Sequence, residues 1–242
     1  MRALLSVCYG TARPEALQQF FYPAHARMRM HFDIHVFCVC SQRMRAVLRQ
    51  NGLCVPDAAQ ALADVYAQGA TQVFVQTLFM ARGAQWRALQ ALCDAWRPLF
   101  DELTLSPPLL PRQAQGCAHI LSAQFPHRNS HGVVLVTHQE PDTRADFAAL
   151  QDALFSAGRN DMLLFPPHVP EAAQQTAAYF RQRGIASVTL GFAMICAGHH
   201  ARHAALSPDG VCALLCAQGL CVRVCLDALG QNTSFAALFD LC

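Results

Sequence analysis

Lysine is absent from this chain, and all 18 of its cationic side chains are arginine. This absence excludes a Schiff-base lysine and a phosphate-binding lysine of the Walker type. Charge of either sign is scarce, because charged residues make up 14% of the chain and the formal net charge is +2. So small an excess, without a clustered basic run, argues against a nucleic acid or a membrane surface as partner. Arginine remains well suited to binding carboxylates in a bidentate manner.

Long hydrophobic runs are missing as well. No apolar stretch approaches the roughly 20 residues of a membrane-spanning helix, and the opening MRALLSVCYG matches a core strand better than a signal peptide. We therefore expect a cytoplasmic protein whose 12 cysteines are reduced thiols. None of these cysteines has the CxxC spacing of a zinc site, so core packing is expected for most of them. The 242 residues, 53% of them hydrophobic, suffice for one large domain or two lobes.

One stretch of the sequence occurs nearly twice. The run GATQVFVQTLFMARG, from Gly69, aligns without a gap on GIASVTLGFAMICAG, from Gly184, at an offset of 115 residues (184 minus 69). Directly after this run the first copy continues with AQ, whereas the second continues with His199 and His200. The chain therefore carries one duplicated unit with a histidine pair in the second copy alone.

A second, shorter echo pairs LLSVCYGT with VLVTHQE, and Tyr9 then falls opposite His138. Strand-like runs alternate with helical periodicity in both halves, which is typical of parallel sheets flanked by helices. We expect two α/β lobes related by pseudo-twofold symmetry, 1–128 and 129–242, separated near the polar stretch PHRNSHG. Strands are expected at 4–8, 33–38, 72–79, 102–105, 132–137, 162–165, 187–194 and 220–226. Helices are expected at 14–29, 41–50, 57–68, 86–96, 112–124, 143–157 and 170–183, with a last one in LGQNTSFAALFDLC capped by Asn232 or Thr233.

Histidines gather where strands of the second half end. Ligands of open α/β sheets bind beyond the carboxyl ends of the strands, and His138 and the pair His199 and His200 follow two such ends. His168 follows a third, and His203 lies four residues after His199, a spacing that could bind a metal on one helix face. Imidazole suits Co, Ni, Fe and Zn and also accepts protons. The residues alone leave two interpretations open: a metal or acid–base cleft, or a solvated turn and helix start.

Six segments in order resemble one family, the anaerobic sirohydrochlorin cobaltochelatases, which stand with the ferrochelatases among the ATP-independent tetrapyrrole chelatases. The segments are VCYGTARPEAL, CSQRMRAVL, GATQVFVQTLFMARG, VVLVTHQEPDTRADFAALQ, GFAMICAGHHARHA and LDALGQNTSFAALF. The resemblance implies two flavodoxin-like lobes with the tetrapyrrole in the cleft between them. It places His138 at the histidine of the family's GHG segment and His200 at that of its AGDHA segment. In the family these two histidines bind the divalent metal and remove pyrrole protons.

The sequence departs from the family pattern at its metal ligands. Ala84 and Gln85 stand where the family usually supplies a glutamate, and Phe79 replaces a common histidine. The segment FPPHV, where the family often has another glutamate, leaves His168 as the nearby ligand. These departures imply either an all-histidine site, in which His199 or His203 replaces the carboxylate, or weakened metal binding.

The resemblance implies a chelatase that inserts a divalent metal into sirohydrochlorin or a related tetrapyrrole on a route to cobalamin or a similar product. Co²⁺ is the first choice of metal, with Fe²⁺ and Ni²⁺ as alternatives, and no organic cofactor is expected. The alternative function is a non-catalytic carrier of tetrapyrrole or metal on the same fold, and a homo-oligomer is left open. The residues expected to bind the substrate and its carboxylates are Tyr9, Gly10, Thr11, Arg13 and Arg82.

Overall fold

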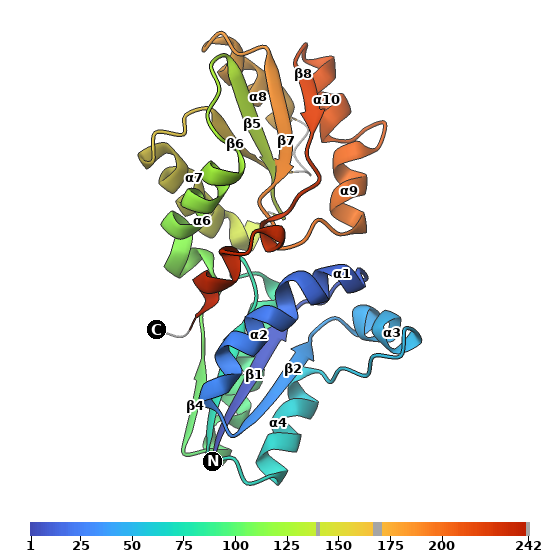
Figure 1. Cartoon of the computed structure of the whole chain (residues 1–242), viewed down its shortest axis with the longest axis vertical. Coiled ribbons are helices and arrows are strands. Elements are labelled where there is room, and N and C mark those ends of the chain that lie inside the picture. Colours follow the sequence, from blue (N-terminus) through green and yellow to red (C-terminus); the bar gives the residue numbers. More distant parts are fainter. Residues whose placement is uncertain (139–140, 167–170, 241–242) are drawn as a thin grey trace. The chain divides into compact units, whose positions relative to one another are not determined.

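The chain forms two parallel β-sheets of four strands each within the part that the computed structural model describes, residues 1–138, 141–166 and 171–240 (Figure 1). For residues 199 and 200 that description covers the backbone. The strand orders are β2-β1-β3-β4 and β6-β5-β7-β8, the same pattern twice, which confirms the expected doubled α/β fold. The strands are β1 (Arg2–Cys8), β2 (Ile34–Val39), β3 (Gln72–Thr77), β4 (Glu102–Leu105), β5 (His131–Val136), β6 (Met162–Phe165), β7 (Ser187–Phe192) and β8 (Cys221–Val224).

Helices connect these strands in each half. The first half contains α1 (Pro14–Ala16), the π-helix η1 (Leu17–Phe21), α2 (Tyr22–Met28), η2 (Arg29–His31), α3 (Gln42–Gln50), α4 (Ala58–Ala67), α5 (Ala84–Trp96) and η3 (Arg97–Leu99). The second half contains α6 (Leu110–Gln124), η4 (Pro141–Thr143), α7 (Arg144–Ser156), α8 (Glu171–Arg181), α9 (His199–Leu206), α10 (Val211–Ala217), η5 (Leu229–Gln231) and η6 (Phe235–Phe239). Side chains cap the N-termini of α3 and α4: Ser41 Oγ accepts a hydrogen bond from the amide of Met44, and Asp57 Oδ1 accepts one from the amide of Gln60.

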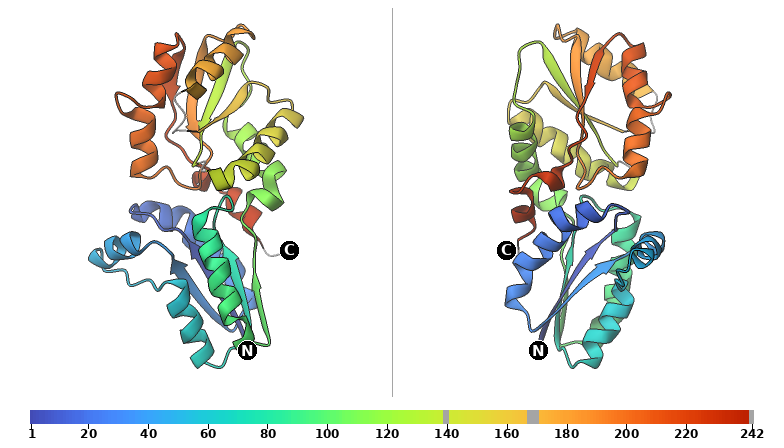
Figure 2. Two further views of the ribbon diagram at one scale, coloured as in Figure 1. Left: turned by 180° about the vertical axis from the view of Figure 1, so that it is seen from behind. Right: turned by 45° about the vertical axis from the view of Figure 1, so that its right-hand side comes forward.

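The first sheet is covered on both faces. Alternate strand residues such as Leu5 and Val75 pack with α4 and α5 in one buried cluster, which includes Leu62. Helix α2 lies on the other face, where the imidazole of His25 is hydrogen-bonded to Ser6 of β1 at 2.8 Å. Figures 1 and 2 show this arrangement, with α2 in front of the strands in one view and α4 and α5 in front in the view from behind. Helices on both faces are the usual solution for a parallel sheet.

The second sheet packs one face against α8, α9 and α10. Val134 and Val188 lie in a buried cluster with Phe180 of α8 and Leu215 of α10. Gly132 makes this packing close, because a Cβ atom there would stand 2.6 Å from the ring of Phe180. On the opposite face, a Cβ atom at Gly191 would stand 2.5 Å from the ring of Phe125, which follows α6.

The chain divides into two compact units at a point different from the one expected. Residues Met1–Arg112, together with the chain from Ala236 onward, form the first unit, and Gln113–Phe235 form the second. The expected division between 128 and 129 puts all of α6 in the first lobe and the C-terminus in the second, whereas most of α6 belongs to the second unit. Packing explains the difference, because α6 leads into Phe125 on the second sheet, whereas the C-terminal segment returns to the first.

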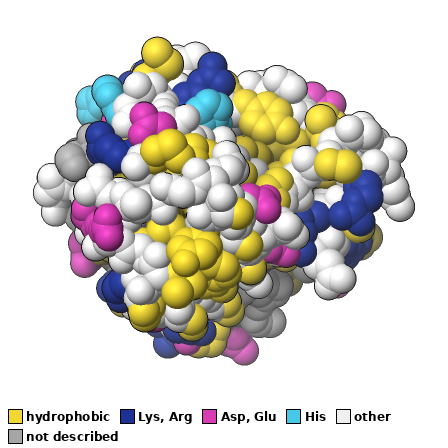
Figure 3. Space-filling view, turned by 90° about the horizontal axis from the view of Figure 1, so that it is seen from below, with side chains coloured by type: hydrophobic (Ala, Val, Ile, Leu, Met, Phe, Trp, Pro, Cys, Tyr) yellow, Lys and Arg dark blue, Asp and Glu magenta, His cyan; other side chains and the backbone are white. Residues whose placement is uncertain are grey.

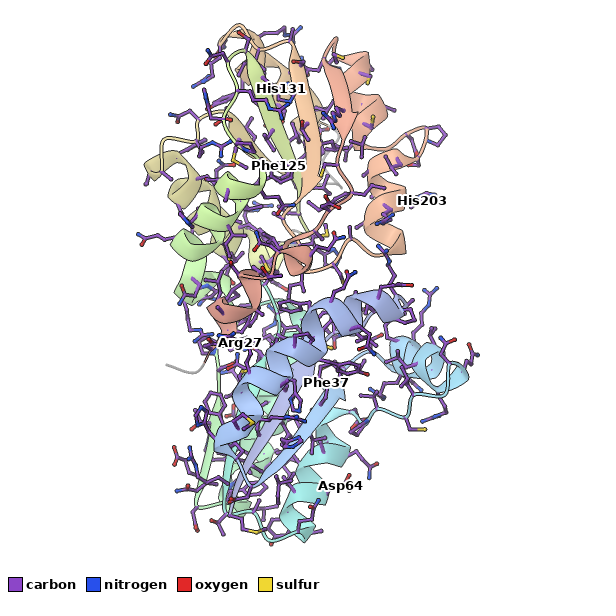
Figure 4. All side chains as sticks on the ribbon, viewed as in Figure 1. Arg27, Phe37, Asp64, Phe125, His131 and His203 are labelled. Carbon is purple, nitrogen blue, oxygen red and sulfur yellow. The ribbon has the colours of Figure 1, made fainter. Side chains whose placement is uncertain are left out.

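The contacts that hold the C-terminal segment on the first unit include an aromatic pair and an ion pair. The rings of Phe20 and Phe239 meet edge to face with centroids 5.5 Å apart. Asp240 forms an ion pair with Arg27, which Figure 4 labels. This segment was expected to be one helix capped at Asn232 or Thr233. It instead forms two short 3₁₀ turns, η5 and η6, separated at those residues.

None of the helices within the described ranges is long and apolar enough to cross a membrane. On the face drawn in Figure 3, basic and acidic side chains are interspersed among apolar and other polar groups. This mixture agrees with the small net charge of +2.

Candidate active site

Two loops leave neighbouring strands of the second sheet at its carboxyl edge; one contains His138, and the other leads to His199 and His200. Strands β5 and β7 pair in parallel, with Val136 opposite Phe192 at their last residues. His138 follows β5 by two residues and is exposed. The chain after β7 is tied to β5 by a hydrogen bond of 2.9 Å from the amide of Ala193 to the carbonyl of Val136. The two loops therefore begin side by side, at the edge where parallel sheets place their ligands.

Helix α9 begins with the histidine pair. Gly198 is its N-cap residue, and His199 and His200 form the first turn. Arg202 holds the loop before the helix, because its Nε donates to the carbonyl of Ala197 at 3.1 Å. Arg202 is not among the site residues predicted from the sequence. The internal repeat could have drawn attention to it, because Arg202 lies 115 residues after Arg87.

The internal repeat is reproduced in the backbone. Strand β3 spans 72–77 and β7 spans 187–192, so both bounds are shifted by 115. Helices α5 and α9 start at residues 84 and 199, again 115 apart, each after an extended glycine cap, Gly83 or Gly198. The first copy thus presents Ala84 and Gln85 where the second presents His199 and His200.

The remaining predicted ligands are placed unevenly. His168 lies outside the described residues. His203 lies on α9 one helical turn after His199 and is exposed, and Figure 4 labels it. Among the residues described, no group of three or more His, Cys, Asp or Glu side chains could hold a metal ion. The pairing of His138 with His200, and the ligand role of His199, therefore remain predictions.

The first sheet carries the predicted substrate-binding loop at its own carboxyl edge. After β1 the chain passes through Tyr9, which is 52% exposed, and then turns at Gly10, whose φ is +105°. A Cβ atom at Gly10 would stand 2.5 Å from Cγ1 of Val39 and 2.8 Å from Cβ of Met44. Only glycine fits this turn, because the φ angle is positive and a Cβ atom would overlap the side chains of Val39 and Met44.

The same loop is ordered by Thr11. This side chain is 4% exposed, and its Oγ1 accepts a hydrogen bond from the amide of Arg13 at 3.1 Å. The Arg13 guanidinium is half-exposed and lies 3.9 Å from Glu15, a loose contact that leaves it in reach of solvent. Arg82 is exposed in the loop between β3 and α5. Both arginines thus follow strands of the first sheet at the same edge.

Thiols near this edge are poor candidates for metal binding at neutral pH. Burial raises the pKa of the Cys40 thiol to about 11, against the smaller lowering effect of Arg45, so the thiolate form that binds metals is scarce. Of the 11 described cysteines, all with free thiols, four are buried: Cys8, Cys38, Cys93 and Cys117. Three are exposed and four are half-buried, so core packing accounts for fewer of them than expected.

Relatives with established names match the chain over nearly its whole length. A curated sirohydrochlorin cobaltochelatase of Salmonella typhimurium is 26% identical over 251 residues, which cover 98% of this chain and 93% of that protein. The sirohydrochlorin chelatase SirB of Bacillus subtilis subspecies spizizenii, solved in complex with cobalt, superposes with a TM-score of 0.63 at 13% identity. SirB from Bacillus subtilis with Fe³⁺ gives 0.67 at 13% identity. In both cases the match covers 98% of this chain and 92% of the other, and at such identities it shows the fold.

The family assignment follows from a sequence model. The model described as cobalt chelatase (CbiK) matches residues 2–240, almost the entire chain. The expected two-lobed chelatase fold, the ordered motifs and this match agree with one another. The chain therefore belongs to the cobalt chelatase (CbiK) family.

Proposed function

We propose that this protein inserts Co²⁺ into sirohydrochlorin or a closely related tetrapyrrole. The proposal is carried by two neighbouring strand ends at the carboxyl edge of one sheet: His138 follows β5, and the loop after β7 leads into α9, which opens with His199 and His200. The chain also matches the cobalt chelatase model over residues 2–240. The curated relative acts, by its name, on sirohydrochlorin with cobalt.

The chemistry asks two things of the protein. The metal ion must be held with open coordination positions, and the two pyrrole N–H protons must be removed as the metal enters the ring. A neutral imidazole can do either, because its unprotonated nitrogen is a metal ligand and a base. We assign these roles to His138 and His200, with His199 and His168 as further ligands. His138 is exposed at the strand end, where a substrate can reach it.

Substrate carboxylates need cationic or amide donors. The loop Tyr9, Gly10, Thr11 with Arg13, and the exposed Arg82, provide such groups at the carboxyl edge of the first sheet. A guanidinium binds a carboxylate through two parallel hydrogen bonds, which fixes orientation as well as charge.

Turnover separates an enzyme from a carrier on the same fold. Purified protein is mixed with sirohydrochlorin and Co²⁺, both in large excess over protein, and insertion is followed by the change in the absorbance of the ring. Many equivalents of product formed faster than in a protein-free control support the chelatase. Conversion that stops at one equivalent of tightly bound ring would instead establish the carrier. Parallel reactions with Fe²⁺ and Ni²⁺ determine the metal preference.

A further inference from the structure

A polar strip lies on the second sheet at the amino ends of its strands. It consists of His131 on β5, Ser187 and Thr189 on β7, and Cys221 and Arg223 on β8. The strand register places them together, because His131 pairs with Ser187, Ser187 with Cys221, and Thr189 with Arg223. The five side chains also share one face of the sheet. Val188 and Val222, which alternate with them along β7 and β8, point to the opposite face and pack in the core covered by α8, α9 and α10. Figure 4 shows the His131 side chain on the face of this sheet turned toward the viewer.

This strip is unusual for a parallel sheet, both of whose faces are normally apolar and covered. Arg223 is exposed, and the side chains of His131, Ser187 and Thr189 are half-buried rather than enclosed. The strip is also remote from the proposed chelatase site. His131 opens β5 and His138 follows its end, a separation of about 20 Å at the usual strand rise.

The imidazole of His131 organises the two hydroxyls. Its Nδ1 lies 2.9 Å from Ser187 Oγ, and its Nε2 lies 2.8 Å from Thr189 Oγ1. A neutral ring has one N–H, so one hydroxyl accepts from it and the other donates to it. A protonated ring donates to both hydroxyls, which frees both hydroxyl protons to point outward. Protonation of His131 therefore turns the pair into two outward donors.

Two arginines supply positive charge beside these donors. Arg128 is bridged to His131 across a tight turn, and Arg223 neighbours Thr189 on the next strand. Within the described residues neither guanidinium forms an ion pair or a hydrogen bond. The nearby carboxylate, Asp161, is occupied by Arg159, which donates to both of its oxygens at 2.8 Å. The strip thus carries uncompensated positive charge.

The protonation state of His131 is set by all of these neighbours. Burial lowers its pKa, the charges of Arg128 and Arg223 lower it further, and Asp161 acts in the opposite direction. Cys221 lies exposed on the strand after the next, β8. A bound anion would offset the two arginines and would accept hydrogen bonds that protonated His131 makes available. Anion binding and protonation of His131 must therefore favour each other.

From this geometry we propose that His131, Ser187, Thr189, Arg128 and Arg223 form a second binding site, separate from the chelatase site, for the oxyanion group of a small ligand, a carboxylate or a phosphate. The hydroxyls and guanidinium groups donate to the oxygens, and His131 takes up a proton as the anion binds. Paired donors from arginine and hydroxyl side chains suit such groups.

The test is an NMR titration of the His131 ring between pH 5 and 8 in sodium chloride, sulfate or acetate at equal ionic strength. Sulfate stands for the phosphate group, acetate for the carboxylate, and chloride controls for screening. The His131 signal is assigned by its loss in His131→Gln. We expect the better oxyanion to raise the pKa of His131 by about 1 pH unit relative to chloride, equivalent to tenfold tighter binding by the protonated form.

Two variants make the test specific. Arg223→Gln removes an exposed charge from the strip and should abolish the oxyanion-dependent change, whereas Arg181→Gln, an equal loss of exposed charge on α8, should leave it intact. Thr189→Ser keeps the hydroxyl and should retain the change. Equal pKa values of His131 in all three salts would overturn the proposal, as would an unchanged oxyanion effect in Arg223→Gln. A concentration-dependent dimer that Arg223→Gln dissociates would assign the strip to self-association instead.

Discussion

Gly10→Ala should destabilise the first unit more than any other glycine substitution at a turn. Its φ of +105° is disfavoured for residues with a Cβ atom, at a cost of about 1–2 kcal/mol. The added Cβ would also stand 2.5 Å from Cγ1 of Val39 and 2.8 Å from Cβ of Met44, and such overpacking typically costs about 1–3 kcal/mol. Together these give a loss of about 2–5 kcal/mol in the free energy of unfolding.

Gly69→Ala is the matched control. Gly69 also has a positive φ, +82°, but a Cβ atom there would meet nothing within 4 Å. We expect this control to lose about 1 kcal/mol, the backbone contribution alone. Urea unfolding followed by tryptophan fluorescence reports on the correct unit, because both tryptophans, Trp86 and Trp96, lie on α5 and pack against the first core. Equal losses for the two variants would refute the argument from close packing.

Three further predictions concern other parts of the molecule. Burial first, then His35 and Arg29, lowers the pKa of His25 to about 4. Below about pH 6.5 the unfolded state therefore binds more protons than the folded state, and roughly 1–3 kcal/mol of the free energy of unfolding should be lost as the pH falls to about 4. Urea unfolding measured across this pH range should show the loss in the unmodified protein and not in His25→Gln. Asp161→Leu leaves the buried Arg159 charge unpaired and should cost about 3–5 kcal/mol, measured by hydrogen exchange in the second sheet. Arg202→Gln removes the hydrogen bond from Arg202 to the Ala197 carbonyl and should lower kcat with little change in the free energy of unfolding, whereas exposed Arg181→Gln should change neither.

The sequence predicted the elements whose causes are local. Short apolar runs between segments of helical periodicity predicted all eight strands of the described chain. The offset of 115 residues in the internal repeat predicted the matching positions of β3 and β7. A helix start at the histidine pair was one of the interpretations left open, and α9 begins there. These features depend on neighbouring residues and on repetition, both of which are visible in a single sequence.

Long-range packing was beyond that reasoning. The return of the C-terminal segment to the first unit depends on contacts such as Phe20 with Phe239, more than 200 residues apart, and no local pattern encodes them. The short helix α10 was not predicted either, because its apolar and cysteine-rich residues lack a clear helical period. The strip around His131 was also missed, because it joins three strands, and His131 alone resembled a loop residue.

The most direct test of the chelatase assignment is the rate of Co²⁺ insertion into sirohydrochlorin by His138→Ala and His200→Ala. His119→Ala, which removes an exposed histidine on α6, serves as the control. Loss of a residue that binds the metal or accepts a pyrrole proton should lower the rate by about 10²-fold or more. We predict such losses for His138→Ala and His200→Ala, with folding and tetrapyrrole binding retained, and an unchanged rate for His119→Ala. Insertion by both single variants at the rate of the unmodified protein would contradict the account.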